Sequence, residues 1–361
     1  MLTTYYIFSV LFLLAAILPF IVHQHWIFRV PEIGRIQVMF LQIVIVLSGV
    51  LFINDKNELF YISISLHSLL ILHHFSLLMP YTSLYKKREK EKIIKQSDAV
   101  SVISVNVYQF NQQYQNLIDL VLEVKPDILL TMESNQAWED ALTAIETDYP
   151  NYKKVALENT YGMHFYTRLN VVSIKVNYFI SDDLPSIEAS VITDDGFNFT
   201  FFGVHPPPPS PTEEDTSKER DGELLALGKR VLETKGASIV VGDFNNVAWA
   251  KSSILFRKTS KLIDPRIGRG FVSTYHARYR LLRFPIDLFF HSTEIFIEDF
   301  KTLHDIGSDH LPLFSRFFMN QSEDIQEDEI EILDSDEQEE VEEMIDEGVE
   351  EESDRPQVAV E

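Results

Sequence analysis

A carboxylate and a carboxamide close one strongly apolar segment in a way that could serve catalysis. Residues 239–243 read Ile-Val-Val-Gly-Asp, and Asn245 follows two positions after Asp243. The β-branched run predicts a buried strand, and side chains alternate along extended chain, so Asp243 and Asn245 should lie on the same side. Such a carboxylate can orient or deprotonate a water molecule, and the amide can donate a hydrogen bond to a phosphoryl oxygen. The same Gly-Asp-x-Asn pattern also describes an ordinary turn at the end of a strand, so the neighbouring segments must decide its meaning.

Three other strongly apolar segments also end in polar residues. They are 100–107, which carries Asn106 near its end, 128–133, which ends on Glu133, and 199–204, which is followed by His205. Four prolines follow His205 and cannot continue a sheet, so this histidine should lie at the rim. Polar residues delivered by the ends of separate strands are typical of a site in an α/β domain. Glu133, at the end of an apolar strand, needs a partner, which is either a divalent cation or a salt bridge.

Two later segments add an aspartate and an Asp-His pair. Asp287 lies within the apolar segment 284–290, and Asp309 and His310 follow a Gly-Ser turn. Adjacent side chains point apart in extended chain, so Asp309 can meet a metal while His310 meets the substrate. A hydrogen bond from His310 to Asp287 would fix the imidazole tautomer and favour its charged form.

In their order and spacing, these residues resemble the endonuclease/exonuclease/phosphatase superfamily. The resemblance covers residues 99–318, and its strongest pieces are Gly242-Asp243-Phe244-Asn245 and Gly307-Ser308-Asp309-His310. It implies a four-layered α/β sandwich, in which two packed mixed sheets are flanked by helices. It also implies a hydrolase that cleaves a phosphate ester with a divalent cation, usually Mg²⁺, with Mn²⁺ as the alternative ion.

The resemblance further implies a role for each matched residue. The metal ligands would be Glu133, Asn106 and Asp309, and the catalytic residues would be His205, Asp243, Asn245, Asp287 and His310. Asp243 would orient the attacking water, and Asn245 would hold a phosphoryl oxygen. His310, oriented by Asp287, and His205 would stabilise the transition-state charge or protonate the leaving oxygen. The chemistry of the donors agrees, because the sequence has no cysteine and oxygen ligands suit a hard cation.

Three apolar runs in the first eighty residues predict a membrane anchor. They are residues 5–22, 36–53 and 60–79, each about long enough to cross a hydrocarbon core. The alternative, buried helices of a soluble protein, would require a very large core around them. We therefore expect three transmembrane helices and a multi-pass location in the cell membrane.

The side of the membrane on which the large domain lies stays open. Arg29 and Arg35 lie in the first connection, and a lysine-rich cluster at 85–92 follows the third run, so most nearby positive charge falls on one side. The positive-inside rule makes that side cytoplasmic. The sequence also resembles a subgroup with about three spans before this domain, which includes glycopeptide-resistance proteins, and those proteins place the domain outside the cell.

Charge and composition divide the chain into four parts. We expect a membrane anchor over 1–82, a basic linker over 83–98, the catalytic domain over 99–319 and an acidic tail over 320–361. Residues 323–361 hold 20 of the 55 acidic residues and one of the 31 basic residues, so most of the net charge of −24 belongs to the tail. Sparse apolar residues there predict disorder. A cation or partner contact is the alternative for the tail.

The predicted function is a membrane-anchored, divalent-metal-dependent phosphoesterase acting on a phosphomonoester or phosphodiester. A lipid-linked substrate is attractive, because tethering raises the effective concentration of a membrane substrate. A nuclease of the same fold is one alternative, but the domain is slightly acidic and no long basic or aromatic insertion is present to grip DNA. An inert membrane scaffold is the other, and it gives no chemical need for all these polar residues. Arg220, in the predicted helix 213–233, could reach a phosphate or be a solvated helix charge.

Overall fold

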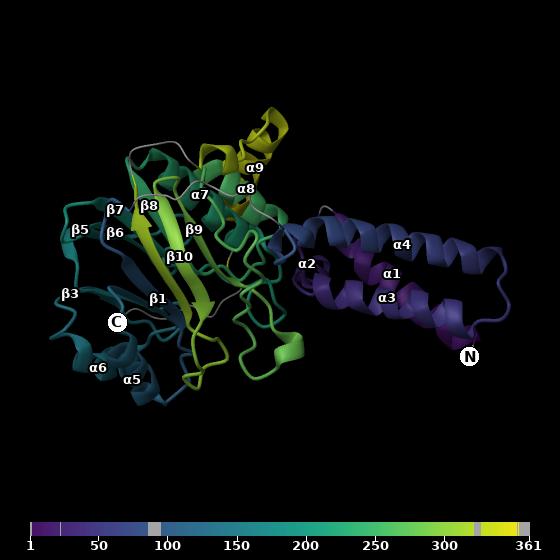
Figure 1. The fold of residues 1–361 in the computed structure, drawn as a ribbon, viewed down its shortest axis with the longest axis horizontal. Helices are drawn as coiled ribbons and strands as arrows, with labels where there is room; N and C mark the ends of the chain where they lie inside the picture. The colour runs from purple at the N-terminus through teal and green to yellow at the C-terminus, as the bar shows by residue number, and fades with distance from the viewer. Residues whose placement is uncertain (1, 22, 86–94, 321–325, 352, 354–361) are drawn as a thin grey trace.

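Three long apolar helices extend from one side of a globular α/β domain in the computed structural model (Figure 1). The structure describes residues 2–21, 23–85, 95–320, 326–351 and 353. The helices α1 (Leu2–Ile17, continued by η1, Leu18–Phe20), α3 (Arg35–Phe52) and α4 (Glu58–Leu78, continued by η2, Met79–Tyr81) are each long and apolar enough to cross a membrane. The three predicted spans are therefore confirmed in length and composition. Most of the lysine-rich cluster at 85–92 lies outside the described residues.

The first connection of the anchor contains a short helix, α2 (Trp26–Ile33), which the apolar runs did not predict. It lies where the helical bundle meets the domain (Figure 1). The indole nitrogen of Trp249 donates a hydrogen bond to the carbonyl oxygen of Glu32 at 3.0 Å. At the start of α2, the Trp26 amide donates to the carbonyl oxygen of Asp215 at 2.9 Å. These bonds fix α2 to the domain rather than leaving it as a free loop.

Two mixed sheets form the centre of the domain. The first has the order β10 (Ile295–Thr302), β11 (Leu313–Met319), β1 (Val100–Asn106), β2 (Ile128–Met132), β4 (Met163–Thr167), β3 (Asn151–Val155). The second has the order β5 (Asn170–Asn177), β6 (Ser186–Ile192), β7 (Asn198–Val204), β8 (Ala237–Asp243), β9 (Asp287–His291). The pairs β1/β2 and β7/β8 are parallel, and the other pairs are antiparallel. Parallel pairing brings the carboxyl ends of neighbouring strands to one edge, and those ends carry the predicted site residues.

The sheets pack face to face, and helices cover their outer faces. Between the sheets lies an apolar core in which the rings of Phe165 and Phe201 are 5.2 Å apart. The helices are α5 (Tyr114–Val124) and α6 (Gln136–Leu142, followed by η3, Thr143–Ile145) on the first sheet, and α7 (Lys218–Glu233) and α8 (Lys251–Ser260) on the second. Two further single turns are η4 (Arg280–Leu282) and η5 (Glu327–Glu329). The expected four-layered sandwich of helix, sheet, sheet and helix is thus confirmed.

The expectation that residues 320–361 are disordered is wrong for much of the described tail, which forms the helix α9 (Ser335–Glu350). A capping box between Asp334 and Glu337 begins it. Val341, with Met344 and Ile345 one turn further on, packs against apolar residues of α7 and α8. Ion pairs join the two helices to the tail: Lys229 with Glu342, Lys251 with Glu340 and Lys258 with Glu337. The sparse apolar residues therefore have helical spacing, and lysines of the domain offset the acidic charge.

A charge placed at Val341 should destabilise the domain. Val341 is 2% exposed, so Val341→Asp would bury an unpaired carboxylate and lower the free energy of unfolding by about 2 to 3 kcal/mol. The measurement is thermal unfolding of the full-length protein in detergent. Val349→Asp is the matched control, because Val349 lies on the same helix but is 62% exposed. Equal melting temperatures for the two variants would show that α9 does not pack on the domain.

Candidate active site

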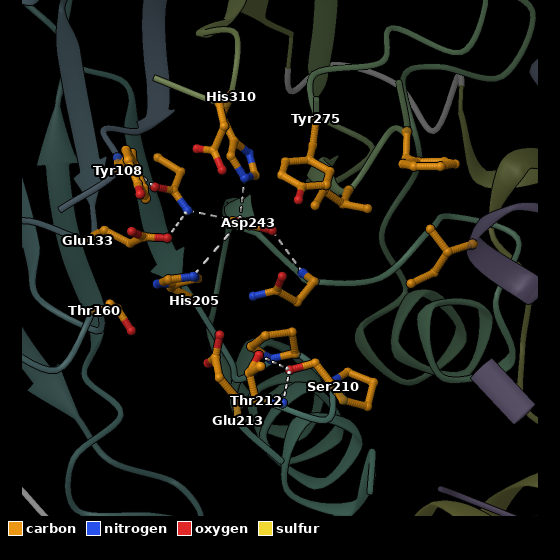
Figure 2. Close-up of a pocket in the computed structure, with 18 of the residues that line it drawn as sticks. Tyr108, Glu133, Thr160, His205, Ser210, Thr212, Glu213, Asp243, Tyr275 and His310 are labelled. Atoms are coloured by element: carbon orange, nitrogen blue, oxygen red, sulfur yellow. Dashed lines mark hydrogen bonds and ion pairs between the residues drawn. The ribbon is translucent and has the colours of Figure 1, made fainter. Parts of the chain in front are cut away.

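Seven of the eight predicted site residues line a single cavity of about 570 Å³ at the carboxyl ends of the central strands. They are Asn106, Glu133, His205, Asp243, Asn245, Asp309 and His310. Figure 2 shows Asp243 in the middle of this group, with His310, His205 and Glu133 around it. The eighth, Asp287, lies behind His310 at the start of β9. The structure thus brings together residues that are up to about 200 positions apart in the chain.

Asp243 is the centre of the polar contacts. Its Oδ1 atom accepts a hydrogen bond from the backbone amide of Asn245 at 2.9 Å, and its Oδ2 atom accepts one from Asn106 Nδ2 at 3.1 Å. The Nε2 atoms of His310 and His205 lie 3.5 Å and 3.9 Å from the same Oδ2 atom. The preceding residue must be glycine, because a Cβ atom there would lie 1.9 Å from a carbonyl oxygen of β7. Close approach of β7 and β8 therefore holds His205 and Asp243 together.

The two histidines differ in charge. Burial lowers the pKa of His205 to about 4, so this imidazole is neutral near pH 7. Burial also acts to lower the pKa of His310, but the charges of Asp287 and Asp243 outweigh it and raise that pKa to about 10. Burial raises the pKa of Asp243 above its ordinary value. One cationic and one neutral imidazole beside a carboxylate of raised pKa are suited to acid-base chemistry near neutral pH.

His310 is oriented from two directions. Its Nδ1 atom lies 2.8 Å from Asp287 Oδ2, which is the hydrogen bond that the sequence predicted. Its backbone amide donates to Ser308 Oγ at 3.0 Å, and the same hydroxyl donates to the carbonyl oxygen of Asn106 at 2.8 Å. The Gly-Ser-Asp-His turn is therefore fastened to the end of β1. Only the Nε2 edge of the imidazole is left to face Asp243 and the cavity.

Glu133 and Asp309 are the residues best suited to hold a divalent cation. Glu133 is partly buried, and burial raises its pKa to about 7 although the Asn106 side chain and the backbone amide of Gln109 donate hydrogen bonds to it at 2.8 Å and 3.0 Å. A cation beside this carboxylate would compensate for its lost hydration. The nearby Asp309 carboxylate adds to the same negative field. Both offer oxygen atoms, as a hard cation requires.

Asn106, predicted as a metal ligand, has a different geometry. Its Oδ1 atom accepts a hydrogen bond from the Tyr108 amide at 3.0 Å, so its Nδ2 atom faces Glu133 and Asp243. An amide nitrogen does not ligate a hard cation. In this orientation Asn106 positions the two carboxylates.

A second grouping of donors consists of Asp243, Asp287 and His310, whose ligand atoms lie within 4.8 Å of one another. Both Asp287 and Asp243 lie beside the His310 ring, on its Nδ1 and Nε2 sides respectively. This arrangement matches a histidine that is hydrogen-bonded to Asp287 and ion-paired with Asp243 as well as a metal site.

Sequence reasoning missed several residues of the cavity. The Tyr275 ring packs at a tilt of 45° against the His310 ring, with 4.8 Å between ring centres, and Tyr161 donates a hydrogen bond to Glu213 at the cavity wall. These residues lie in loops or turns, where no strand pattern marks them. Arg220 is neither a phosphate ligand nor a solvated charge. It is 2% exposed, pairs with Asp221 and donates to the carbonyl oxygen of Asn245 at 3.0 Å, so it supports the loop after β8.

Two packed mixed sheets with buried carboxylates and imidazoles at the strand ends agree with the fold that the sequence resemblance implies. The sequence model of the endonuclease/exonuclease/phosphatase family matches residues 103–310. This match spans more than half of the chain, and the protein belongs to that family. No curated protein shows significant sequence similarity to the chain.

Solved structures have the same fold at low sequence identity. A humanized TDP2 of D. rerio is 16% identical, with a TM-score of 0.52 over 62% of this chain and 99% of that one. A family protein of Bacteroides thetaiotaomicron is 18% identical, with a TM-score of 0.52 over 64% and 98%. The human Nocturnin catalytic domain, solved with a bound sulfate anion, is 15% identical, with a TM-score of 0.50 over 63% and 97%.

Proposed function

We propose that the protein is a membrane-anchored, divalent-metal-dependent phosphoesterase that hydrolyses a phosphomonoester or phosphodiester bond of a lipid-linked substrate. The observation that carries the proposal is the composition of the cavity. The cavity is lined by the carboxylates and imidazoles and also by Val30 and Ile33 of α2 and the following Gly34. The cavity therefore combines a polar centre with an apolar wall from the anchor.

The residues of the polar wall divide the work of hydrolysis. Mg²⁺ or Mn²⁺, held by Glu133 and Asp309, would polarise the phosphoryl group. Asp243 would accept the proton of the attacking water, for which its raised pKa suits it. The cationic His310 would stabilise charge on the phosphoryl oxygens, held in place by Asp287.

The remaining polar residues would bind the substrate. Asn245 donates one amide hydrogen bond to the carbonyl oxygen of Pro206 at 3.0 Å, which leaves its second N–H for a phosphoryl oxygen. His205 is neutral, so it can donate a hydrogen bond to the leaving oxygen without adding charge. Both residues are positioned by backbone at the ends of β7 and β8.

The apolar wall supports a substrate with a hydrocarbon part. Phe284 and Ile286 continue the surface formed by α2, and Ile33 packs with both of them in one apolar cluster. A soluble sugar phosphate would leave this wall in contact with water. Helices that span the membrane would also hold the cavity close to lipid substrates.

A nuclease is the second candidate, and one feature favours it. The exposed side chains of Tyr108 and Phe110 lie at the rim of the cavity with ring centres 5.6 Å apart. Exposed aromatic rings can stack on bases of single-stranded nucleic acid. One solved D. rerio TDP2 structure is a complex with a single-strand DNA product. Cleavage of single-stranded DNA, with binding that weakens steeply as salt rises, would favour this candidate.

Metal dependence is tested with Glu133→Gln. We expect full-length protein to hydrolyse phosphate esters with Mg²⁺ and to lose activity in EDTA, and the variant to bind Mg²⁺ about 100-fold more weakly because a carboxylate ligand is lost. Calorimetric titration with Mg²⁺ measures the affinity, and a panel of a lipid diphosphate, an aryl monoester, an aryl diester and single-stranded DNA measures activity. Glu123→Gln, on the exposed side of α5, is the control. Activity that persists in EDTA contradicts the metal role.

A further inference from the structure

The loop that leads into β9 carries an exposed apolar tip. Leu281, in η4, is 90% exposed, the largest exposed fraction among large apolar side chains in the described part of the chain. Leu282 and Tyr279 beside it are more than half exposed. Together, residues 278–283 read Arg-Tyr-Arg-Leu-Leu-Arg. Exposed apolar side chains grouped in this way, with charged residues around them, mark a contact surface.

The tip lies beside the start of a candidate membrane span. The side-chain amide of Gln37 donates a hydrogen bond to the carbonyl oxygen of Leu281 at 3.1 Å. Gln37 belongs to the first turn of α3, and the span begins at Arg35. In Figure 1 the green loop that contains η4 lies on the side of the domain from which the helical bundle extends. A helix that enters a bilayer at Arg35 would place Leu281 at the depth of its first turn.

The arginines around the tip are suited to lipid headgroups. Arg278 and Arg280 are exposed, and within the described residues neither forms an ion pair. Arg283 instead donates to the backbone carbonyl oxygens of His276 and Ala277, which stiffens the loop. Guanidinium groups bind phosphate with paired hydrogen bonds, and long basic side chains can reach headgroups while apolar neighbours enter deeper.

We propose that residues 278–283 form a second membrane contact, in which Leu281 and Leu282 enter the bilayer interface and Arg278 and Arg280 bind anionic headgroups. The inference requires α1, α3 and α4 to span the membrane, but it does not depend on the reaction. The loop that carries residues 278–283 also connects to the site. Tyr275 and Phe284, on either side of it, pair through backbone hydrogen bonds, and both line the cavity. Because α2 and Phe284 belong to the same apolar surface of the cavity, this contact turns the mouth of the cavity toward the bilayer.

The absence of cysteine from the sequence makes a direct test practicable. Single cysteines at Leu281, Leu47 and Val172 would each carry the fluorophore NBD in full-length protein, reconstituted in phosphatidylcholine and phosphatidylglycerol vesicles. Leu47 is exposed on α3 and reports the spanning helix, whereas Val172, 62% exposed on β5, reports the domain surface. Nitroxide groups near the headgroup or deep in the acyl chains then measure depth. Leu281 has almost no packing to lose, so its substitution should not disturb folding.

We expect the label at residue 281 to emit at shorter wavelength and to be quenched several-fold more by the shallow nitroxide than the label at 172. The label at 47 should respond to the deep nitroxide. The double variant Arg278→Gln with Arg280→Gln should reduce quenching at 281 to the level seen in vesicles without phosphatidylglycerol. A label at 281 that behaves like the one at 172 overturns the contact, and an unquenched label at 47 overturns the spanning helix on which it depends.

Discussion

Asp243→Asn should lower kcat by about a thousandfold without unfolding the protein. Asparagine keeps the size of the side chain, but it cannot accept a proton from water. It also turns an amide toward Asn106, where the carboxylate now accepts a hydrogen bond at 3.1 Å. The neighbouring charge of His310 would lose its closest counter-charge within the cavity. The measurement is steady-state hydrolysis of the best phosphate ester substrate by both proteins.

The melting temperature separates this result from simple misfolding. Because burial raises the pKa of Asp243 in the folded protein, its charged form costs stability, and that cost grows as pH rises above the unfolded pKa. Asp243→Asn should therefore melt no lower than wild type at pH 8. Asp119→Asn, on the exposed side of α5, is the matched control and should retain full activity. Retained activity in Asp243→Asn would remove this residue from the mechanism.

Asp287→Asn should move the alkaline limit of activity to lower pH. In the folded protein the charges of Asp287 and Asp243 overcome burial and hold the pKa of His310 at about 10. Removing one of these charges, which is hydrogen-bonded to Nδ1 at 2.8 Å, should lower that pKa by about one to three pH units. Activity that needs the cationic imidazole would then fall between pH 7 and 9 in the variant, whereas wild type would stay active. The pH profile of kcat measures the shift.

The pairing of His310 with Asp287 should stabilise the folded protein more at low pH than at high pH. A raised folded pKa means that the pairing stabilises the protein fully below the unfolded pKa of histidine, and that this gain is lost as pH rises from about 6.5 to about 10. Asp287→Asn should thus lower the melting temperature more at pH 6 than at pH 10. Asp299→Asn, an exposed aspartate paired with Lys301, is the control. An unchanged alkaline limit would mean that Asp287 does not set the charge of His310.

The strand ends were the part of the site that the sequence could predict. Asp243, Glu133 and His205 each follow a run of apolar residues, so the sequence pattern places each of them at the end of a strand. They come from two different sheets, and their convergence follows from the fold that the resemblance implies. The pairing of His310 with Asp287 was also predictable, because an imidazole and a carboxylate in one site are expected to form a hydrogen bond. The four-layered fold came with the resemblance rather than with any single segment.

Other features depend on contacts between distant segments and could not be predicted. The orientation of the Asn106 amide depends on Glu133 and Asp243, whose carboxylates accept hydrogen bonds from its Nδ2 atom, and not on its residue type. The ring contact between Tyr275 and His310 joins a loop to a turn with no periodic pattern. The acidic tail looked disordered by composition, and its helix forms because lysines of α7 and α8 face it. In each case the deciding interaction lies outside the segment that was being interpreted.

The segment after Asn245 packs against the N-terminal helices and so connects them to the domain. Residues 247–250 lie in one apolar cluster with Leu78 and Tyr81 at the end of α4, and Tyr81 donates a hydrogen bond to the carbonyl oxygen of Ala248 at 3.2 Å. The loop that ends β8 is therefore part of the joint to the helices. An exchange of this anchor for an unrelated one would have to rebuild a wall of the cavity and a support of the catalytic loop.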